Sequence, residues 1–185
     1  MGVTDAADEA RRSVILVGFM GAGKSTIGRM VARRLSLCFV ETDAMITAHE
    51  GKSIPEIFAE HGEAHFRRLE AEVLDLLAEK RGHVIATGGG FPCRPGAMER
   101  LRELGTVVWL ASGFETTYER ASRVGERPML TARSREEAAA LYEARQDYYR
   151  RAHLSVDTTL LSVDAAANRI LRYLRERDWR STVTS

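Results

Sequence analysis

Residues 13–26 read SVILVGFMGAGKST, and this stretch decides the fold. Its first five residues form a β-branched and aliphatic run, which predicts a buried parallel strand that ends at Gly18. Residues 18–26 satisfy the pattern G-x-x-x-x-G-K-S/T between that strand and a helix. Backbone N–H groups of such a loop, together with the positive end of the helix, cradle phosphate groups. The stretch therefore predicts an α/β protein that binds a nucleoside triphosphate.

Two side chains of this loop carry specific chemistry. Lys24 supplies a mobile positive charge for the β- and γ-phosphates, and the Ser25 hydroxyl is placed to ligate Mg²⁺. The predicted nucleotide site comprises Gly21, Ala22, Gly23, Lys24, Ser25 and Thr26. The loop does not identify the phosphoryl acceptor, which stays open between water, a protein, a nucleotide and a metabolite.

The rest of the chain alternates strand-length apolar runs with segments of helical period, a pattern typical of a parallel sheet covered by helices on both faces. The further candidate strands are residues 39–42, 84–87, 107–110 and 154–157. Ser-x-x-Glu capping boxes predict helix starts at Ser53, Ser112 and Ser134. Two more helices are expected over about residues 62–81 and 163–177.

Length and composition indicate one domain. The chain has 185 residues, 44% of them hydrophobic and 29% charged, which is enough for a single core. We expect this domain to span residues 13–178, between tails at 1–12 and 179–185. An interval at about 124–134 lacks both periods and is predicted to be a mobile surface loop.

Charge and cysteine content exclude several classes of protein. The formal net charge is +1, so no basic field predicts binding to nucleic acid. No stretch approaches the roughly 20 apolar residues of a membrane helix, so no membrane association is expected. Cys38 and Cys93 form no disulfide framework or metal motif, and we interpret both as structural. We therefore expect a soluble, cytoplasmic protein.

Ligands of open parallel sheets bind beyond the carboxyl ends of the strands, so residues that follow strands are candidate site residues. Glu41 and Asp43 follow the second strand and could hold a Mg²⁺ shell or accept a proton from an attacking hydroxyl. The alternative is a strand end in which Asp43 caps the next helix. Gly88, Gly89 and Gly90 follow the third strand, where the backbone either approaches a ligand or forms a plain loop.

A third cluster, FRRLE at residues 66–70, lies on a predicted helix. Arg67 and Glu70 are three residues apart and share a helix face, so Glu70 can orient the guanidinium for a bidentate grip on an anion. The alternative is a solvated, salt-bridged helix face. Arg127, in the loop that contains Gly125 and Pro128, and Arg145, on the helix before the last strand, stay ambiguous when taken alone.

In their order and spacing, these motifs resemble the shikimate kinase family over about residues 14–174. The resemblance rests on GFMGAGKST with the following Ile27 and Gly28, Glu41-Thr42-Asp43, FRRLE, ATGGG, Arg127-Pro128-Met129-Leu130, and Arg145 before Tyr149. It implies a P-loop kinase fold in three layers, with five parallel strands in the order 2-3-1-4-5 and a lid. It also implies Mg²⁺-dependent transfer of the ATP γ-phosphate to the 3-hydroxyl of shikimate, in the route to chorismate, by a protein that we expect to be a monomer.

The resemblance also implies roles for individual residues. Asp43 would bind the ring hydroxyls and help deprotonate the attacking one, while Arg67 and Arg145 would grip the shikimate carboxylate. Arg127 would enter with the lid and stabilise the transferring phosphoryl group, and Arg120 would pack on adenine. Gly88, Gly89 and Gly90 would line the acceptor pocket, Lys24 would contact the phosphates, and Ser25 and Glu41 would take part in the Mg²⁺ site.

The chain departs from the family pattern at three places. Glu41 replaces the first Asp of the family pair, Arg145 lacks the proline that often follows it, and residues 91–94 read FPCR in place of a run of small residues. Two alternatives therefore stay open. One is a kinase for another small polyhydroxy acid or shikimate analogue, and the other is a nucleotide-binding regulatory module without catalysis.

Overall fold

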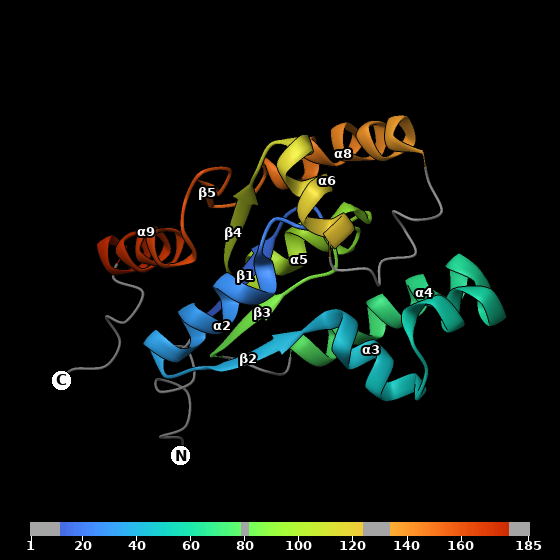
Figure 1. The fold of residues 1–185 in the computed structure, drawn as a ribbon. Coiled ribbons are helices and arrows are strands. Elements are labelled where there is room, and N and C mark those ends of the chain that lie inside the picture. Colours follow the sequence, from blue (N-terminus) through green and yellow to red (C-terminus); the bar gives the residue numbers. More distant parts are fainter. Residues whose placement is uncertain (1–11, 79–81, 124–133, 178–185) are drawn as a thin grey trace, which may run out of the picture.

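A computed structural model describes residues 12–78, 82–123 and 134–177 of the chain. Five parallel strands form one sheet in the order β2-β3-β1-β4-β5, as Figure 1 shows. They are β1 (Ser13–Val17), β2 (Cys38–Glu41), β3 (His83–Ala86), β4 (Gly105–Ala111) and β5 (Leu154–Asp157). The predicted α/β class and strand order are confirmed. The predicted tails, apart from Arg12, and nearly all of the predicted lid, Arg127 included, lie outside the described residues.

The central strand is β1, which is buried along its whole length. It is hydrogen-bonded to β3 on one side and to β4 on the other, so that Ile15 lies opposite both Ile85 and Val107. Both faces of the strand are covered by helices, which is why its sequence is apolar without alternation. The register fixes where the loop after β1 meets the loops after the neighbouring strands.

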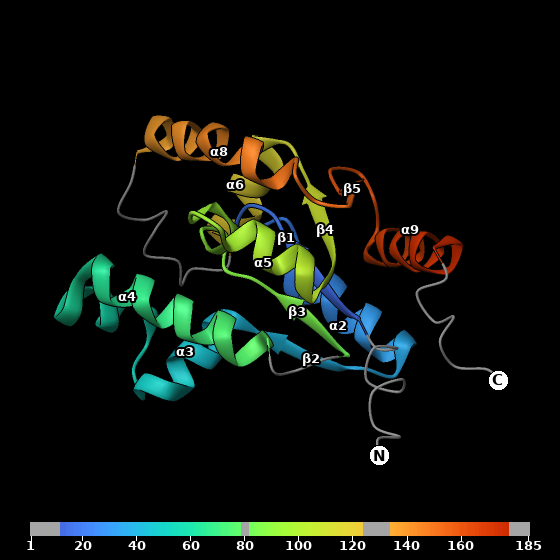
Figure 2. The ribbon, with the colours of Figure 1, turned by 180° about the vertical axis from the view of Figure 1, so that it is seen from behind.

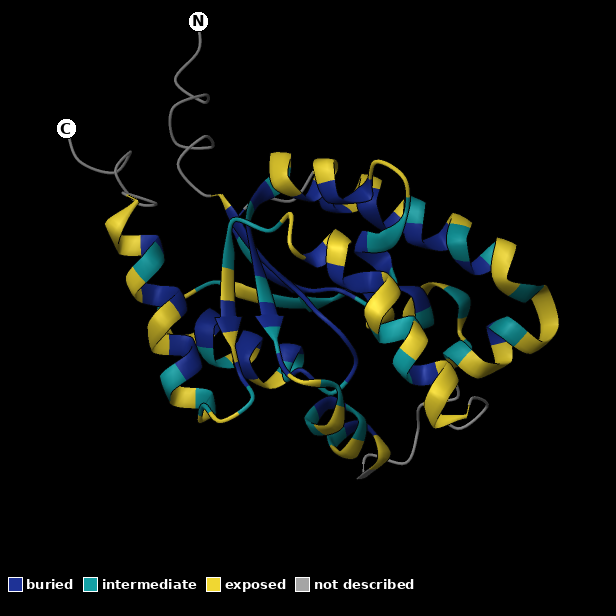
Figure 3. Ribbon diagram, turned by 90° about the horizontal axis from the view of Figure 1, so that it is seen from above, coloured by how far each residue is buried: buried dark blue, intermediate teal, exposed yellow. Residues whose placement is uncertain are grey.

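Helices cover the two faces of the sheet in separate groups. On one face, α2 (Lys24–Leu35) and α9 (Val163–Glu176) enclose a core with Val14 and Leu16. On the other, α4 (Ile54–Ala78), α5 (Ala97–Leu104) and α8 (Arg135–Tyr149) pack with α3 (Thr42–Glu50) and α6 (Phe114–Arg123). Figures 2 and 3 show the resulting three layers, with the buried central strand β1 inside the sheet and helices whose outer faces are exposed. None of the described helices is long and apolar enough to cross a membrane.

A glycine divides α4 into two helical parts. Gly62 has φ 73° and ψ 178°, values that interrupt the helix between Ile54 and Ala78. The first part begins at the predicted capping box, in which the Glu56 carboxylate accepts hydrogen bonds from the backbone N–H of Ser53 at 2.8 Å and from its hydroxyl at 2.6 Å. The second part begins at Gly62, as predicted, and the described segment ends at Ala78.

The capping box at Ser134 forms, but the one predicted at Ser112 does not. The Ser134 hydroxyl accepts from the Glu137 N–H at 3.2 Å, and the Glu137 carboxylate accepts from the Ser134 N–H at 2.7 Å. The Ser112 hydroxyl is buried without a hydrogen-bond partner among the described residues, because α6 begins later, at Phe114. Glu115 instead pairs with Arg135 at 2.6 Å. A long-range ion pair has replaced the local cap.

Replacing the two serines tests this assignment. We expect Ser134→Ala to lower the free energy of unfolding by about 1 kcal/mol, because a helix loses its N-cap. Ser112→Ala should not lower it, because removing a buried hydroxyl that has no partner among the described residues loses no hydrogen bond and relieves a desolvation cost. Urea unfolding followed by circular dichroism gives both values. Equal losses in the two variants would contradict the capping assignment.

Both cysteines are free thiols, in agreement with the absence of a disulfide framework in the sequence. Cys38 is exposed on the edge strand β2. Cys93 is half-buried, and burial raises the pKa of its thiol. Cys93 is therefore a poor nucleophile, which agrees with the structural role predicted for it.

Candidate active site

The loop between β1 and α2 is built around positions that accept only glycine. Gly18, Gly21 and Gly23 have φ values of 143°, 81° and 91°. A Cβ at Gly21 would lie 2.2 Å from the backbone oxygen of Thr117, and one at Gly18 would lie 2.7 Å from that of Leu110. Because the obstacles are backbone atoms, no side-chain movement could make room. The predicted phosphate-binding loop therefore packs closely against α6 and the end of β4.

The N-terminus of α2 opens onto this loop. Its N-cap is Gly23, no described side chain caps it, and its first turn contains no acidic residue. Its N–H groups and the positive end of its dipole are therefore directed at the loop, which suits an anion. Lys24 is buried there, and its ammonium donates to the carbonyls of Gly18 at 2.8 Å and Phe19 at 2.9 Å. These bonds hold the amine against the loop.

The two residues predicted for the metal site are in direct contact. The Ser25 hydroxyl donates a hydrogen bond to the Glu41 carboxylate, although they come from α2 and β2. Arg29 contacts the other carboxylate oxygen of Glu41 at 2.6 Å. Hydroxyl and carboxylate oxygens are the ligand types that Mg²⁺ prefers. The longer side chain that replaces the family's aspartate still reaches the serine.

A cavity of about 290 Å³ lies between this loop and the turn after β3. Gly21, Gly23, Lys24, Ser25, Thr26, Glu41, Asp43, Gly88, Gly89 and Arg120 all line it. Of the residues predicted for the nucleotide, Ala22 is instead buried behind the loop. Arg120 of α6 donates to the carbonyl of Thr159 at 3.2 Å, which holds its guanidinium beside the loop after β5. The cavity thus joins the predicted nucleotide and acceptor residues.

Asp43 faces the turn after β3. Helix α3 begins at Thr42, so Asp43 lies in the first turn and the alternative that it caps the helix is wrong. A Cβ at Gly88 would lie 2.5 Å from the Asp43 Oδ1, so a side chain at this position would push the carboxylate out of its place. The buried Thr42 accepts a hydrogen bond from the Gly88 N–H at 2.9 Å. The sequence analysis gave Thr42 no role, although it is the contact that holds the turn at α3.

The pair formed by Arg67 and Glu70 is not a solvated helix face. Arg67 Nη1 contacts Glu70 Oε2 at 2.8 Å, and the Glu70 side chain is only 2% exposed. Burial raises the pKa of Glu70, although the ion pair with Arg67 opposes this shift. Glu63, 67% exposed, contacts Arg67 Nη2 at 2.7 Å from the solvent side. The two carboxylates fix the guanidinium of Arg67 in one orientation.

A second arginine meets Arg67 at the glycine turn. A Cβ at Gly90 would lie 3.1 Å from Arg145 Nη2 and 3.2 Å from Arg67 Nη1, and one at Gly89 would lie 3.2 Å from Arg145 Nη1. Arg145 comes from α8 and is buried. Two guanidinium groups that approach one turn repel each other unless an anion lies between them. This arrangement therefore suits a ligand carboxylate, which matches bidentate arginine geometry.

Tyr149 of α8 also holds the glycine turn. In the sequence, this tyrosine served only to mark the position of Arg145. Tyr149 is fully buried, and its hydroxyl donates to the Gly89 carbonyl at 2.6 Å. It follows Arg145 by four residues on α8, so one face of this helix carries both Arg145 and the residue that supports the turn. That i,i+4 spacing was the signal that could have identified it.

The FPCR segment changes the site less than its sequence indicates. Phe91, Pro92 and Cys93 form a short 3₁₀ helix, η1, in which Phe91 is fully buried in the core. Cys93 and Arg94 border a second cavity, of about 560 Å³, together with Arg67 and Arg145. The departure from the family pattern therefore affects the outer wall at the arginine end, not the surroundings of Asp43.

Comparison with known proteins now identifies the family. A family model described as "Shikimate kinase" matches residues 20–175. The chain belongs to the shikimate kinase family. A shikimate kinase from Geobacter sulfurreducens is 43% identical over 166 residues, which cover 89% of this chain and 92% of that protein. The match spans both the phosphate loop and the arginine end of the site.

Solved structures of the shikimate kinase family have the same fold. A shikimate kinase from Acinetobacter baumannii in complex with shikimate is 34% identical, with a TM-score of 0.86 over 93% of this chain and 97% of that one. The enzyme from Aquifex aeolicus is 38% identical, with a TM-score of 0.80 over 89% of this chain and 97% of that one. A gluconokinase from Sinorhizobium meliloti, at 17% identity and a TM-score of 0.57, shares the fold alone.

The packing of the phosphate loop predicts a sharp difference between two glycines. Gly21→Ala places a methyl group against the Thr117 backbone, so we expect it to abolish the thermal stabilisation of the protein by Mg-ATP. Gly113→Ala is the matched control, because nothing lies within 4 Å of a Cβ there. Differential scanning fluorimetry with and without Mg-ATP measures both. Normal stabilisation of Gly21→Ala by the nucleotide would contradict the geometry of the loop.

Proposed function

We propose that this chain transfers the γ-phosphate of ATP to the 3-hydroxyl of shikimate, giving shikimate 3-phosphate and ADP. The observation that carries the proposal is the convergence of Arg67 and Arg145 on Gly90, with Asp43 at the adjacent Gly88. A small ring that bears a carboxylate at one end and hydroxyls at the other matches this arrangement. Membership of the shikimate kinase family supports the same acceptor.

The arginine end selects for a carboxylate. Glu70 is buried beside Arg67, and its charge fixes the guanidinium without neutralising Arg145. The shikimate carboxylate would bind both guanidinium groups, and the N–H of Gly89 would add a backbone donor. Ordering the acceptor in this way converts the transfer into a step between groups already in position.

At the other end, Asp43 would accept a hydrogen bond from the attacking hydroxyl. Its carboxylate lies in the first turn of α3, near the positive end of the helix dipole. An ionised carboxylate orients the hydroxyl and takes its proton as the bond to phosphorus forms. No covalent intermediate with the protein is required, because phosphoryl transfer depends on positioning and charge stabilisation.

On the nucleotide side, Lys24 and the N–H groups of the loop would hold the β- and γ-phosphates. Ser25 would hold Mg²⁺ and Glu41 would take part through its contact with that hydroxyl, since their oxygens are hard ligands in direct contact. When bound, Mg²⁺ neutralises charge on the transferring phosphate. Arg120 would pack on the adenine. We assign Arg127 to the same charge stabilisation, by its place in the family pattern alone.

The acceptor is tested by ADP release from Mg-ATP in a coupled assay. Parallel reactions contain shikimate, gluconate, a nucleoside monophosphate or no acceptor. We expect rapid ADP release with shikimate only. Release with gluconate but not with shikimate would assign another acceptor to the site, and nucleotide binding without turnover would support a regulatory module.

Neighbouring arginines on α4 give a matched test of the carboxylate site. Arg67→Ala should raise the KM for shikimate roughly 10- to 100-fold, because an ionic hydrogen bond contributes about 1.5–3 kcal/mol. The KM for ATP should stay nearly unchanged. Arg68→Ala is the control, since Arg68 is exposed and contacts His65 at 3.3 Å, away from the turn. Unchanged shikimate kinetics in Arg67→Ala would remove this residue from the site.

A pair of aspartates tests the proposed base. Asp43→Asn should lower kcat by about 10²- to 10⁴-fold, because the amide cannot take the proton of the attacking hydroxyl. Asp75→Asn should leave kcat unchanged, since Asp75 makes an exposed ion pair with Arg100 at 2.5 Å. Steady-state assays at saturating ATP and shikimate compare the two. A kcat near the wild-type value for Asp43→Asn would exclude proton transfer to Asp43.

A further inference from the structure

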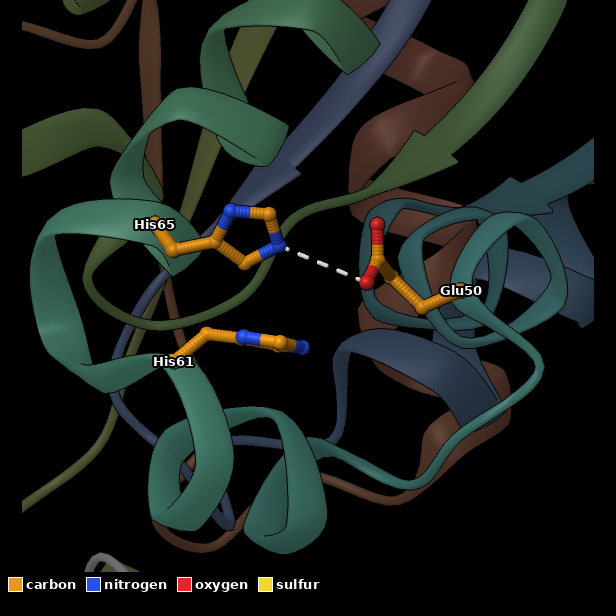
Figure 4. A group of neighbouring side chains, drawn as sticks. All are labelled: Glu50, His61 and His65. Atoms are coloured by element: carbon orange, nitrogen blue, oxygen red, sulfur yellow. Dashed lines mark hydrogen bonds and ion pairs between the residues drawn. The ribbon is translucent and has the colours of Figure 1, made fainter.

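Glu50, His61 and His65 form a compact cluster of ligand-type side chains away from the acceptor residues. Glu50 is the last residue of α3, and the two histidines flank Gly62 in α4. Figure 4 shows both imidazoles directed toward the Glu50 carboxylate. None of the three lines either of the cavities described above. The proposed phosphoryl transfer gives this cluster no task.

The spacing of the cluster matches the first coordination sphere of a small metal ion. His65 Nε2 lies 3.3 Å from Glu50 Oε2. Two ligands of one tetrahedral Zn²⁺, each about 2.0–2.1 Å from the metal, lie about 3.3 Å apart. One ligand atom from each of the three residues lies within 4.8 Å of the others. A shift of about 1.5 Å or less in the His61 ring would therefore complete three tetrahedral positions.

Two glycines create this arrangement in the backbone. Gly51 ends α3 directly after Glu50 with φ 65°, and Gly62 interrupts α4 with φ 73°. A Cβ at either position would meet nothing within 4 Å. The glycines are therefore required by the backbone conformation of the turns and not by close packing. The side chains remain accessible to an ion, with exposed fractions of 16% for Glu50, 25% for His65 and 42% for His61.

We propose that Glu50, His61 and His65 bind a divalent transition-metal ion of the Zn²⁺ class. Two imidazoles and one carboxylate are a donor set that Zn²⁺ takes with water in the fourth position. The same set disfavours Mg²⁺, which prefers oxygen ligands in octahedral geometry. The site is thus chemically distinct from the Mg²⁺ site at Ser25, and it does not depend on the proposed function.

The charges around the cluster are compatible with a cation. Glu60 lies 3.7 Å from His61 Nε2 and adds negative charge, although it also pairs with Lys52. Arg68 approaches His65 Nδ1 at 3.3 Å. A metal on Nε2 leaves the proton of His65 on Nδ1, so the exposed Arg68 guanidinium has to turn toward solvent. Metal binding therefore exchanges the contacts of His65 with Arg68 and with Glu50 for three ligand bonds.

The site would join the two elements that carry acceptor residues. Helix α3 begins beside Asp43 and ends at Glu50, and Arg67 follows His65 by two residues on α4. An ion bound between them fixes the end of α3 to α4. Because it binds the folded chain, it should also raise the melting temperature.

Zinc titration of chelator-treated protein tests the proposal. The protein carries Cys38→Ser, which removes an exposed thiol that would itself bind Zn²⁺, and excess Mg²⁺ is present to occupy oxygen sites. Equilibrium dialysis gives the stoichiometry and affinity, and the visible absorption of Co²⁺ reports the coordination geometry. The variants are Glu50→Gln, His61→Ala and His65→Ala. The control is His49→Ala, because His49 is an exposed imidazole on α3 outside the cluster.

We expect one Zn²⁺ per chain and a tetrahedral Co²⁺ spectrum. Each cluster variant should weaken Zn²⁺ binding by more than the roughly 10- to 100-fold that loss of an outer-shell partner causes. His49→Ala should bind like its parent, and circular dichroism confirms that every variant is folded. Absence of stoichiometric binding, or equal affinity in a His61→Ala/His65→Ala double variant, would overturn the proposal. Neither outcome depends on a measurement of activity with shikimate, so the test is independent of the proposed function.

Discussion

Two hydrogen bonds from Thr87 to the carbonyl of Leu16 hold the halves of the site together. The Thr87 N–H donates at 3.1 Å and its hydroxyl at 3.2 Å, where the turn after β3 leaves the central strand β1. The loop predicted to bind phosphate leaves β1 just beyond Leu16, so the same strand positions both the predicted nucleotide residues and the predicted acceptor residues. The parallel order β2-β3-β1-β4-β5 brings Glu41 and Asp43 to this edge as well. All other features of the site depend on this register.

The conformation of the glycine turn at residues 88–90 depends on side chains from the helices around it. Thr42 binds the N–H of Gly88, and Tyr149 binds the carbonyl of Gly89, so helices on opposite sides fix the turn. Arg67 and Arg145 then approach so closely that a side chain at Gly90 would touch both. Glu70 and Glu63 keep the guanidinium of Arg67 in place, and the excess positive charge at the turn comes from Arg145. A bound carboxylate would neutralise this excess, which couples acceptor binding to local stability.

Local sequence patterns predicted much of the site, and they failed where the structure depends on contacts between residues far apart in the chain. The phosphate loop follows from one contiguous motif, and the contact between Arg67 and Glu70 follows from their i,i+3 spacing, although not the burial of Glu70. The strand order came from the family resemblance. The prediction of a capping box at Ser112 was wrong because Glu115 pairs with Arg135, twenty residues along the chain. The bond between Thr42 and Gly88 spans 46 residues, and no local pattern encodes such a contact.

We propose that the two arginines at the glycine turn recognise the carboxylate of the acceptor. Binding of shikimate and of its uncharged carboxamide, measured by calorimetry on the wild-type chain and on Arg67→Ala, tests this most directly. We expect the wild-type chain to bind shikimate roughly 10- to 100-fold more tightly than the carboxamide, and most of this preference to disappear in Arg67→Ala. A preference of equal size in both proteins would contradict it, because the acceptor charge would then be recognised elsewhere.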